Sequence, residues 1–132
     1  MVFISTAAVA DWRPAKCAAK KLKKGEMSGV LRLVRNPDIL KSIAKTRGRK
    51  TEDVRLVGFA AETNDVLKEA ARKCREKGLS FIVANDVTKK GSGFGTDTNK
   101  VTFVFPDGTQ KKLPLMTKRM VAKRMLDAVS CL

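Results

Sequence analysis

The chain has 132 residues, a formal net charge of +15 at pH 7 and no histidine. This length corresponds to about one domain, and the charge favours an anionic partner such as nucleotide phosphates, nucleic acid or an anionic surface. The lack of histidine excludes histidine general-base chemistry and the commonest metal ligand. The three cysteines are far apart and form no CxxC pair. They therefore argue against a zinc site or a disulfide framework and for reduced thiols in a cytoplasmic protein.

The first residues predict a strand rather than a targeting segment. Residues 2–10 are apolar and end in small side chains, but they are too short to span a membrane and lack the basic start of a signal peptide. We therefore expect no membrane association. A domain rarely opens on a buried central strand, so we expect part of the fold to lie upstream. Asp11 follows this strand, and Pro14 is expected to end it.

A lysine-rich stretch follows at residues 15–27. It contains five lysines and a single acidic residue, Glu26. This composition predicts a flexible loop, because the like charges repel one another. Such a loop can close over phosphates, although a solvated basic face has the same composition, and both interpretations stay open from the residues alone.

Residues 30–34 predict a short strand, and the next residues predict the start of a helix. Asn36 suits the N-cap, Pro37 the first helical position and Asp38 the positive end of the helix dipole. Ile39, Leu40, Ile43 and Ala44 share one face, and residues 46–50 are expected to end the helix as an exposed basic loop.

The stretch that organises the chain is 56–64. It begins as an apolar run without polar alternation, which is typical of a strand covered on both faces. It stops at Glu62 and gives way to helical spacing over 65–77, with Cys74 on the apolar stripe. In open α/β sheets, the carboxyl edge of such a strand is where ligands bind. From these residues alone an ordinary strand-to-helix turn is the favoured interpretation, because the turn lacks a glycine fingerprint.

The second half of the chain predicts a further strand at 79–85, a hairpin over 100–105 and 109–114, and a final helix capped by Thr117. The inward face of that helix is expected to carry Met120, Val121, Met125, Leu126 and Val129. The glycine-rich stretch between 86 and 98 lacks a P-loop signature. The order of elements predicts a single α/β domain over 1–132, Rossmann-like and three-layered. We expect a mostly parallel sheet with helices on both faces and the hairpin on one edge.

Seven motifs in this order closely resemble the bacterial phosphopantothenate–cysteine ligases (phosphopantothenoylcysteine synthetases) of coenzyme A biosynthesis. The motifs lie at residues 7–14, 20–24, 36–40, 57–63, 83–86, 94–99 and 113–115. In bacteria this ligase is usually the carboxyl-terminal part of a flavoprotein fused to a flavin-dependent decarboxylase. The resemblance therefore implies such a decarboxylase domain in the full-length protein and no flavin on this chain.

The resemblance also implies the reaction. The carboxylate of 4′-phosphopantothenate attacks the α-phosphate of CTP to give an acyl-cytidylate, and the amine of cysteine then displaces CMP. Mg²⁺ and lysines are the expected stabilisers of the phosphoryl charge, and the family is dimeric. The family domain begins with a further strand–helix region that this sequence lacks. The chain is thus expected to be the nucleotide-binding part of the ligase, which leaves its activity alone in question.

The site residues are carried over from the motifs that match. The nucleotide site would comprise Ser5, Thr6, Ala7, Asp11, Lys21, Pro37, Asp38, Ile39, Leu40, Phe59, Lys73 and Lys77. Lys21 matches the catalytic lysine, and the backbone of Ala7 and Ala8 lies near the phosphopantothenate site of the family. No metal ligand of the protein is implied. Glu62 and Thr63 mark the family without an assigned role, and the choice of CTP over ATP stays open.

Two other classes of function compete with this interpretation. A small basic nucleic-acid-binding module would explain the charge, but tyrosine is absent and aromatic residues make up 5% of the chain. Base-stacking platforms are therefore scarce, and Phe59, Phe81 and Phe103 lie in apolar runs that predict a core. A structural or dimerisation remnant without ligand affinity is the third possibility.

Overall fold

The computed structural model describes residues 1–23, 25, 29–50, 54–89, 91–92 and 95–132. The chain divides into two compact units, and each is described by itself. The larger unit comprises Met1–Thr6 and Leu40–Leu132, and the smaller unit comprises Ala7–Ile39.

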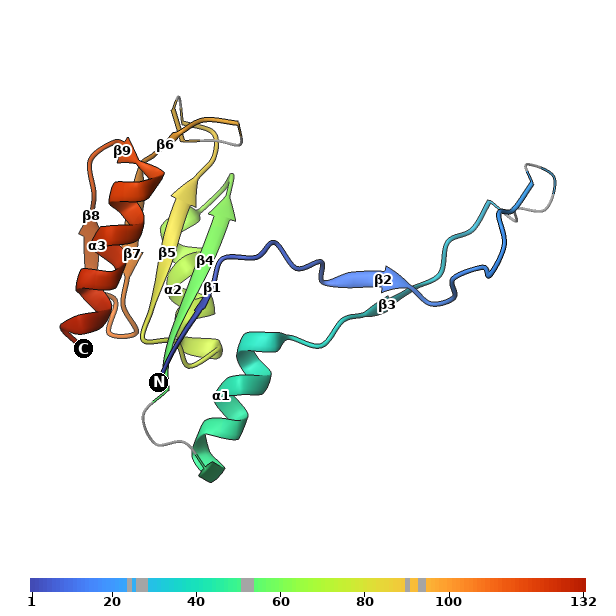
Figure 1. Cartoon of the computed structure of the whole chain (residues 1–132), viewed down its shortest axis with the longest axis horizontal. Coiled ribbons are helices and arrows are strands. Elements are labelled where there is room, and N and C mark those ends of the chain that lie inside the picture. The colour runs from blue at the N-terminus through green and yellow to red at the C-terminus, as the bar shows by residue number, and fades with distance from the viewer. Residues whose placement is uncertain (24, 26–28, 51–53, 90, 93–94) are drawn as a thin grey trace. The chain divides into compact units, whose positions relative to one another are not determined.

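The larger unit is built on a five-stranded sheet with the order β1-β4-β5-β7-β8 (Figure 1). Its strands are β1 (Val2–Ser5), β4 (Arg55–Glu62), β5 (Phe81–Asp86), β7 (Val101–Val104) and β8 (Gln110–Lys112). The first three strands are parallel, and β7 and β8 form an antiparallel hairpin at one edge. The prediction of an α/β fold with a mostly parallel sheet and an edge hairpin is confirmed.

Helices cover both faces of this sheet, as the sequence predicts. Two helices, α1 (Ile39–Lys50) and α2 (Val66–Glu76), pack on one face, and α3 (Lys118–Ser130) packs on the other. The α1/α2 face buries Leu56 and Cys74, and burial raises the pKa of the Cys74 thiol to about 11. The α3 face buries Phe81 and Phe103, whose ring centroids lie 5.2 Å apart. Alternate residues of β4 and β5 therefore enter different cores, which explains why these central strands carry no polar alternation.

Two predictions about the apolar segments are wrong. Residues 2–10 do not form one strand, because β1 ends at Ser5. Among the described residues β1 pairs with β4 alone, and Val2 is 44% and Phe3 37% exposed. In α3, Val121, Met125 and Val129 face the core as expected, but Met120 is 41% and Leu126 55% exposed. An edge strand and the flanks of a helix are covered on one side only, and the apolar character of a residue does not reveal this.

The ends of the helices follow local chemistry. Thr117 caps α3 as predicted, and its Oγ1 accepts from the backbone N–H of Met120 at 3.2 Å. Thr117 also belongs to β9 (Met116–Thr117), which pairs with β6 (Thr98–Asn99). Gly78, at φ +61°, follows α2 at the predicted stop. The expected basic loop at 46–50 is wrong, because α1 continues to Lys50. Lysine and arginine are good helix formers.

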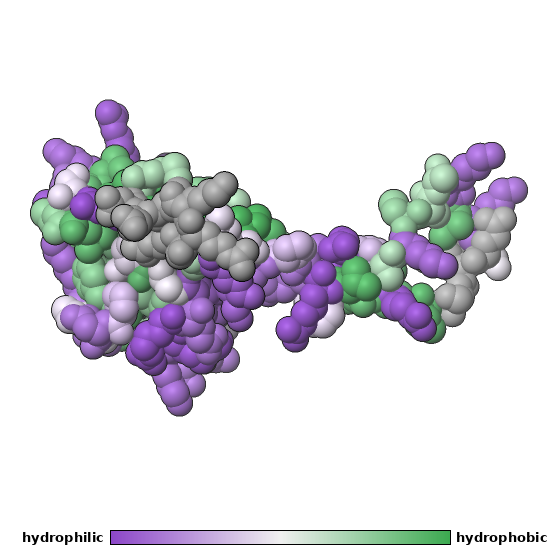
Figure 2. All heavy atoms as spheres, turned by 90° about the horizontal axis from the view of Figure 1, so that it is seen from below, coloured by the Kyte–Doolittle hydropathy of each residue, from purple (hydrophilic) through white to green (hydrophobic). Residues whose placement is uncertain are grey.

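The smaller unit is a two-stranded antiparallel ribbon of β2 (Trp12–Pro14) and β3 (Leu33–Arg35). Pro14 was expected to end the strand that begins at residue 2, and it is instead the last residue of β2, where an edge position tolerates its missing N–H. The Arg35 guanidinium lies over the Trp12 ring, 5.0 Å from its centroid. Hydrophobic side chains are visible on the surface of this unit in Figure 2, and Trp12 and Leu33 are each 48% exposed.

The predicted cap of α1 is wrong for a reason that this ribbon makes visible. Asn36 donates through Nδ2 to the carbonyl of Ala10 at 2.7 Å, and its Oδ1 accepts from Arg13 Nη1 at 2.8 Å. Its backbone N–H donates to the carbonyl of Asp11 at 2.8 Å and so prolongs the ribbon. With its side chain bonded within the ribbon, Asn36 does not cap a helix, and α1 begins at Ile39.

The lysine-rich stretch is described only in part. Residues 15–23 and 25 contain no strand or α-helix, while Lys24, Glu26 and Met27 lie outside the described residues. Its predicted flexibility stays a prediction. Within the described part of the chain, no helix is both long and apolar enough to cross a membrane.

Candidate functional site

The carboxyl ends of β4 and β5 meet at one edge of the sheet. Glu62 and Asp86 are register partners there, whereas β1 ends earlier, with Ser5 opposite Gly58. The strand-to-helix connection after Glu62 leads directly into α2. In an open α/β sheet this is the edge at which ligands bind.

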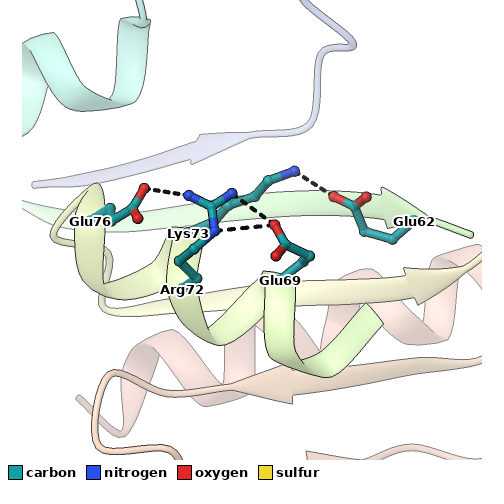
Figure 3. A network of polar contacts seen from close by, with 5 residues as sticks. All are labelled: Glu62, Glu69, Arg72, Lys73 and Glu76. Atoms are coloured by element: carbon teal, nitrogen blue, oxygen red, sulfur yellow. Dashed lines mark hydrogen bonds and ion pairs between the residues drawn. The ribbon is translucent and has the colours of Figure 1, made fainter. Parts of the chain in front are cut away.

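Lys73 and Glu62 are joined at this edge (Figure 3). Lys73 Nζ donates to Glu62 Oε1 at 2.5 Å, and the two side chains are 33% and 22% exposed. Glu62 follows Ala60 by two residues, so it points to the face of the sheet that α2 covers. Lys73 comes from the last turn of α2. The tertiary structure thus places one predicted nucleotide residue against the acidic residue that had no assigned role.

The other charged residues of α2 form a separate network. Arg72 donates to Glu69 Oε2 and to Glu76 Oε2, each at 2.7 Å (Figure 3). The hydrogen bonds that Arg72 donates to Glu69 and then to Glu76 raise the pKa of Arg72, and the bond that Glu69 accepts lowers the pKa of Glu69. Both glutamates of the helix are therefore engaged by Arg72, and Lys73 reaches across to the strand.

Asp86, beside Glu62, is also engaged. Its Oδ1 accepts from the Thr88 hydroxyl at 2.5 Å and from the Thr88 backbone N–H at 3.1 Å, and Lys89 Nζ lies 3.3 Å from Oδ2. The hydroxyl bond from Thr88 is the largest cause of the lowered pKa of Asp86. Both carboxylates at this edge thus have cationic or hydrogen-bonding partners.

The remaining predicted residues of the larger unit lie on different sides of the sheet. Phe59 is half-buried and packs against the α3-side core. Lys73 belongs to α2 on the opposite face, and Lys77 is the C-cap residue of that helix. Lys77 lies one turn beyond Lys73, and its backbone N–H donates to the carbonyl of Lys73 at 3.1 Å. Leu40 packs into the α1/α2 core. Ser5 is half-buried at the end of β1, and Thr6 after it is exposed.

The predicted residues of the smaller unit are all exposed: Ala7, Ala8, Asp11, Lys21, Pro37, Asp38 and Ile39. The ribbon brings Asp11 close to the segment that contains Pro37, Asp38 and Ile39. Because the carbonyl of Asp11 accepts from the backbone N–H of Asn36, Asp11, which directly precedes β2, lies next to the residues that lead into α1. Lys21 lies in the stretch between β2 and β3. The resemblance assigns Asp11 and residues 37–39 to one nucleotide site, and this assignment stays a prediction.

Sequence reasoning missed two buried amides. Asn85, at the carboxyl end of β5, and Asn99, in β6, are each 8% exposed, and neither Oδ1 has a hydrogen-bond partner in the part of the chain that the structure describes. Asn85 follows Phe81 and Val83 at alternate positions and so points to the same face of the sheet as Phe59. A buried acceptor without a donor is unusual and is a natural place for a water or a ligand N–H. Both asparagines lie in motifs that carry the family resemblance, at 83–86 and 94–99, and Asn85 also lies at a strand end, but neither was assigned a role.

The whole chain, residues 1–132, matches the family described as DNA/pantothenate metabolism flavoprotein C-terminal domain. The "Coenzyme A biosynthesis bifunctional protein CoaBC" of Bacillus subtilis is 44% identical over 131 residues, which are 99% of this chain and 31% of that protein. The protein of the same name from Escherichia coli strain K12 is 39% identical over 131 residues, which are 97% of this chain and 31% of that protein.

The fold is also similar to that of a solved structure from a protein of the same name. The crystal structure of the C-terminal domain of a coenzyme A biosynthesis bifunctional protein CoaBC has a TM-score of 0.71 and 38% sequence identity, and the match covers 97% of this chain and 52% of that one. The chain therefore spans about a third of the length of the curated relatives. None of these similarities supports the nucleic-acid-binding alternative. The chain belongs to the family of DNA/pantothenate metabolism flavoprotein C-terminal domains.

Proposed function

We propose that the chain is the nucleotide-binding part of a phosphopantothenate–cysteine ligase. In the proposed reaction, CTP activates the carboxylate of 4′-phosphopantothenate as an acyl-cytidylate, and the amine of cysteine then displaces CMP. The observation that carries the proposal is the match of the whole chain to this family and to relatives named for coenzyme A biosynthesis. The carboxyl edge of the α/β sheet supports the proposal, because Lys73 of α2 is directed there to the end of β4.

The chemistry requires cations. Both steps gather negative charge on phosphoryl oxygens, and fixed positive groups lower the energy of such transition states. We assign Lys21 the catalytic role and Lys73 and Lys77 a role in binding the phosphates. The remaining proposed nucleotide residues are Ser5, Thr6, Ala7, Asp11, Pro37, Asp38, Ile39, Leu40 and Phe59, and Ala7 and Ala8 would also contact phosphopantothenate. The unpartnered Oδ1 of Asn85, on the Phe59 face, is consistent with a ligand that carries N–H donors.

Mg²⁺ would enter with the nucleotide. Among the described residues there is no group of three histidine, cysteine, aspartate or glutamate side chains that could hold a metal ion. Mg²⁺ in nucleotide sites is usually bound by substrate phosphates and one or two carboxylates. The residues present therefore fit an ion that the phosphates carry, with the ion shielding their charge, and not one held by the protein alone. A homodimer, a decarboxylase domain on the same polypeptide and a cytoplasmic location remain predictions.

Calorimetric titration tests the proposal. The chain is titrated with CTP and Mg²⁺, with ATP and Mg²⁺, and with a short single-stranded RNA at two salt concentrations. We expect saturable binding of CTP that is tighter than binding of ATP. An absence of CTP binding together with tight, salt-sensitive RNA binding would overturn the proposal, because phosphate-backbone contacts weaken steeply as salt rises.

A further inference from the structure

Glu62 is bonded to Lys73, one of the proposed phosphate-binding lysines, and it has no role in the proposed function. It ends β4 at the ligand-binding edge of the sheet, is only 22% exposed and bonds Lys73 at 2.5 Å. A carboxylate so close to a site for an anionic ligand would ordinarily weaken the binding of that ligand by repulsion. Its presence therefore needs a compensating function.

The charge pattern of α2 indicates what that function is. Lys73 has glutamates within reach along its own helix, at the i−4 position (Glu69) and the i+3 position (Glu76). Both are bonded to Arg72 instead, at 2.7 Å each. The Lys73 ammonium is thereby directed away from the helix surface and toward the end of β4 (Figure 3).

We propose that Glu62 is a positioning residue that fixes the ammonium of Lys73 at the carboxyl edge of β4 for a phosphate of the bound nucleotide. This inference rests on the proposed function. An ammonium has three donors, and the bond to Glu62 uses one of them, so two remain for phosphate oxygens. A lysine side chain loses much rotamer freedom when it is immobilised. Because Glu62 already immobilises the Lys73 side chain before the nucleotide binds, less conformational entropy is lost on binding.

The test measures CTP affinity by calorimetry on the full chain in five forms: wild type, Glu62→Ala, Glu62→Gln, Lys73→Ala and the double variant Glu62→Ala/Lys73→Ala. We expect Glu62→Ala to weaken CTP binding by about five- to tenfold, a coupling typical of residues in direct contact. Glu62→Gln should keep most of the affinity, because its amide oxygen accepts the same hydrogen bond. The double variant should bind no more weakly than Lys73→Ala.

Two controls separate positioning from a structural effect. Glu76→Ala also removes one carboxylate, but Glu76 lies on α2 and is bonded to Arg72 rather than to Lys73. This variant should leave CTP affinity unchanged. The ammonium signal of Lys73 in a lysine-selective ¹⁵N–¹H NMR spectrum gives a readout that needs no nucleotide. We expect this signal, protected from exchange by Glu62, in the wild type and in Glu62→Gln, and its loss in Glu62→Ala.

The outcomes discriminate between the two proposals. If the wild type does not bind CTP, both the proposed function and this inference fail. If the wild type binds CTP and Lys73→Ala weakens binding, the inference alone fails in three cases. Glu62→Ala could have no effect, it could tighten binding because the carboxylate competes with the phosphates, or it could weaken binding to the same extent with and without Lys73.

Discussion

The two units of this chain are stabilised in different ways. In the larger unit, fully buried side chains such as Leu56 and Phe103 fill two cores on either side of the sheet. In the smaller unit, two strands of three residues each are joined by a short ladder, by the Asn36 bonds and by the stacking of Arg35 on Trp12. An isolated two-stranded ribbon is marginally stable in water. Burial of apolar side chains therefore stabilises the larger unit, whereas individual polar contacts stabilise the smaller one.

Removing apolar volume should therefore affect the two units very differently. Leu56 in β4 is 0% exposed, and Leu56→Ala should lower the free energy of unfolding by about 2–5 kcal/mol, because it leaves a cavity in the α1/α2 core. The matched change in the ribbon, Leu33→Ala, should cost less than about 0.5 kcal/mol, since Leu33 is 48% exposed. Urea unfolding followed by circular dichroism gives both values. Equal losses would show that the ribbon has a core of its own.

The second prediction separates function from stability in the smaller unit. Lys21 is exposed, so Lys21→Ala should leave the free energy of unfolding unchanged. In a complete ligase that contains this chain, it should lower kcat by about 10²–10³-fold, a loss typical of removing one group that stabilises developing charge. CTP affinity should change far less than turnover.

Steady-state kinetics combined with CTP titration measures both effects of Lys21→Ala. Lys45→Ala, a change of the same type at an exposed position of α1, should alter neither. If Lys21→Ala weakens CTP binding as much as turnover, Lys21 binds the nucleotide and is not the catalytic group.

The smallest expected effect concerns the ribbon itself. Asn36→Ala removes the bond to the Ala10 carbonyl and the acceptor for Arg13. We expect a local destabilisation of about 1 kcal/mol, the usual net contribution of a hydrogen bond. Amide hydrogen exchange should become faster at Ala15 and Asn36, whose N–H groups donate across the ribbon. Amides in β5 should be unaffected. Faster exchange in both units would mean that the ribbon and the sheet open together.

Local chemistry made much of this fold predictable. The long apolar stretch of β4, the stripe that carries Cys74 on α2 and the cap at Thr117 are all confirmed. Each depends on residues within a few positions of one another, and helix and strand periodicities are read at that range. The cap at Asn36 and the inward Met120 and Leu126 are wrong because they depend on neighbours that are distant in the sequence. The basic loop at 46–50 is wrong for a local reason, since α1 continues through these helix-forming residues to Lys50.

The sequence by itself determined the family, the layered α/β class and the residue types that the proposed chemistry uses. Motifs and hydrophobic periodicity depend on residues that are close to one another in the sequence, so they can be recognised without the tertiary structure. Only the tertiary structure decided which charges meet. Glu62 and Lys73 lie in different elements, and their bond exists because α2 packs on the face of the sheet to which Glu62 points, while Arg72 engages the two glutamates of the helix. The pairing of a flexible side chain depends on which partners the fold brings within reach, and that information is not local.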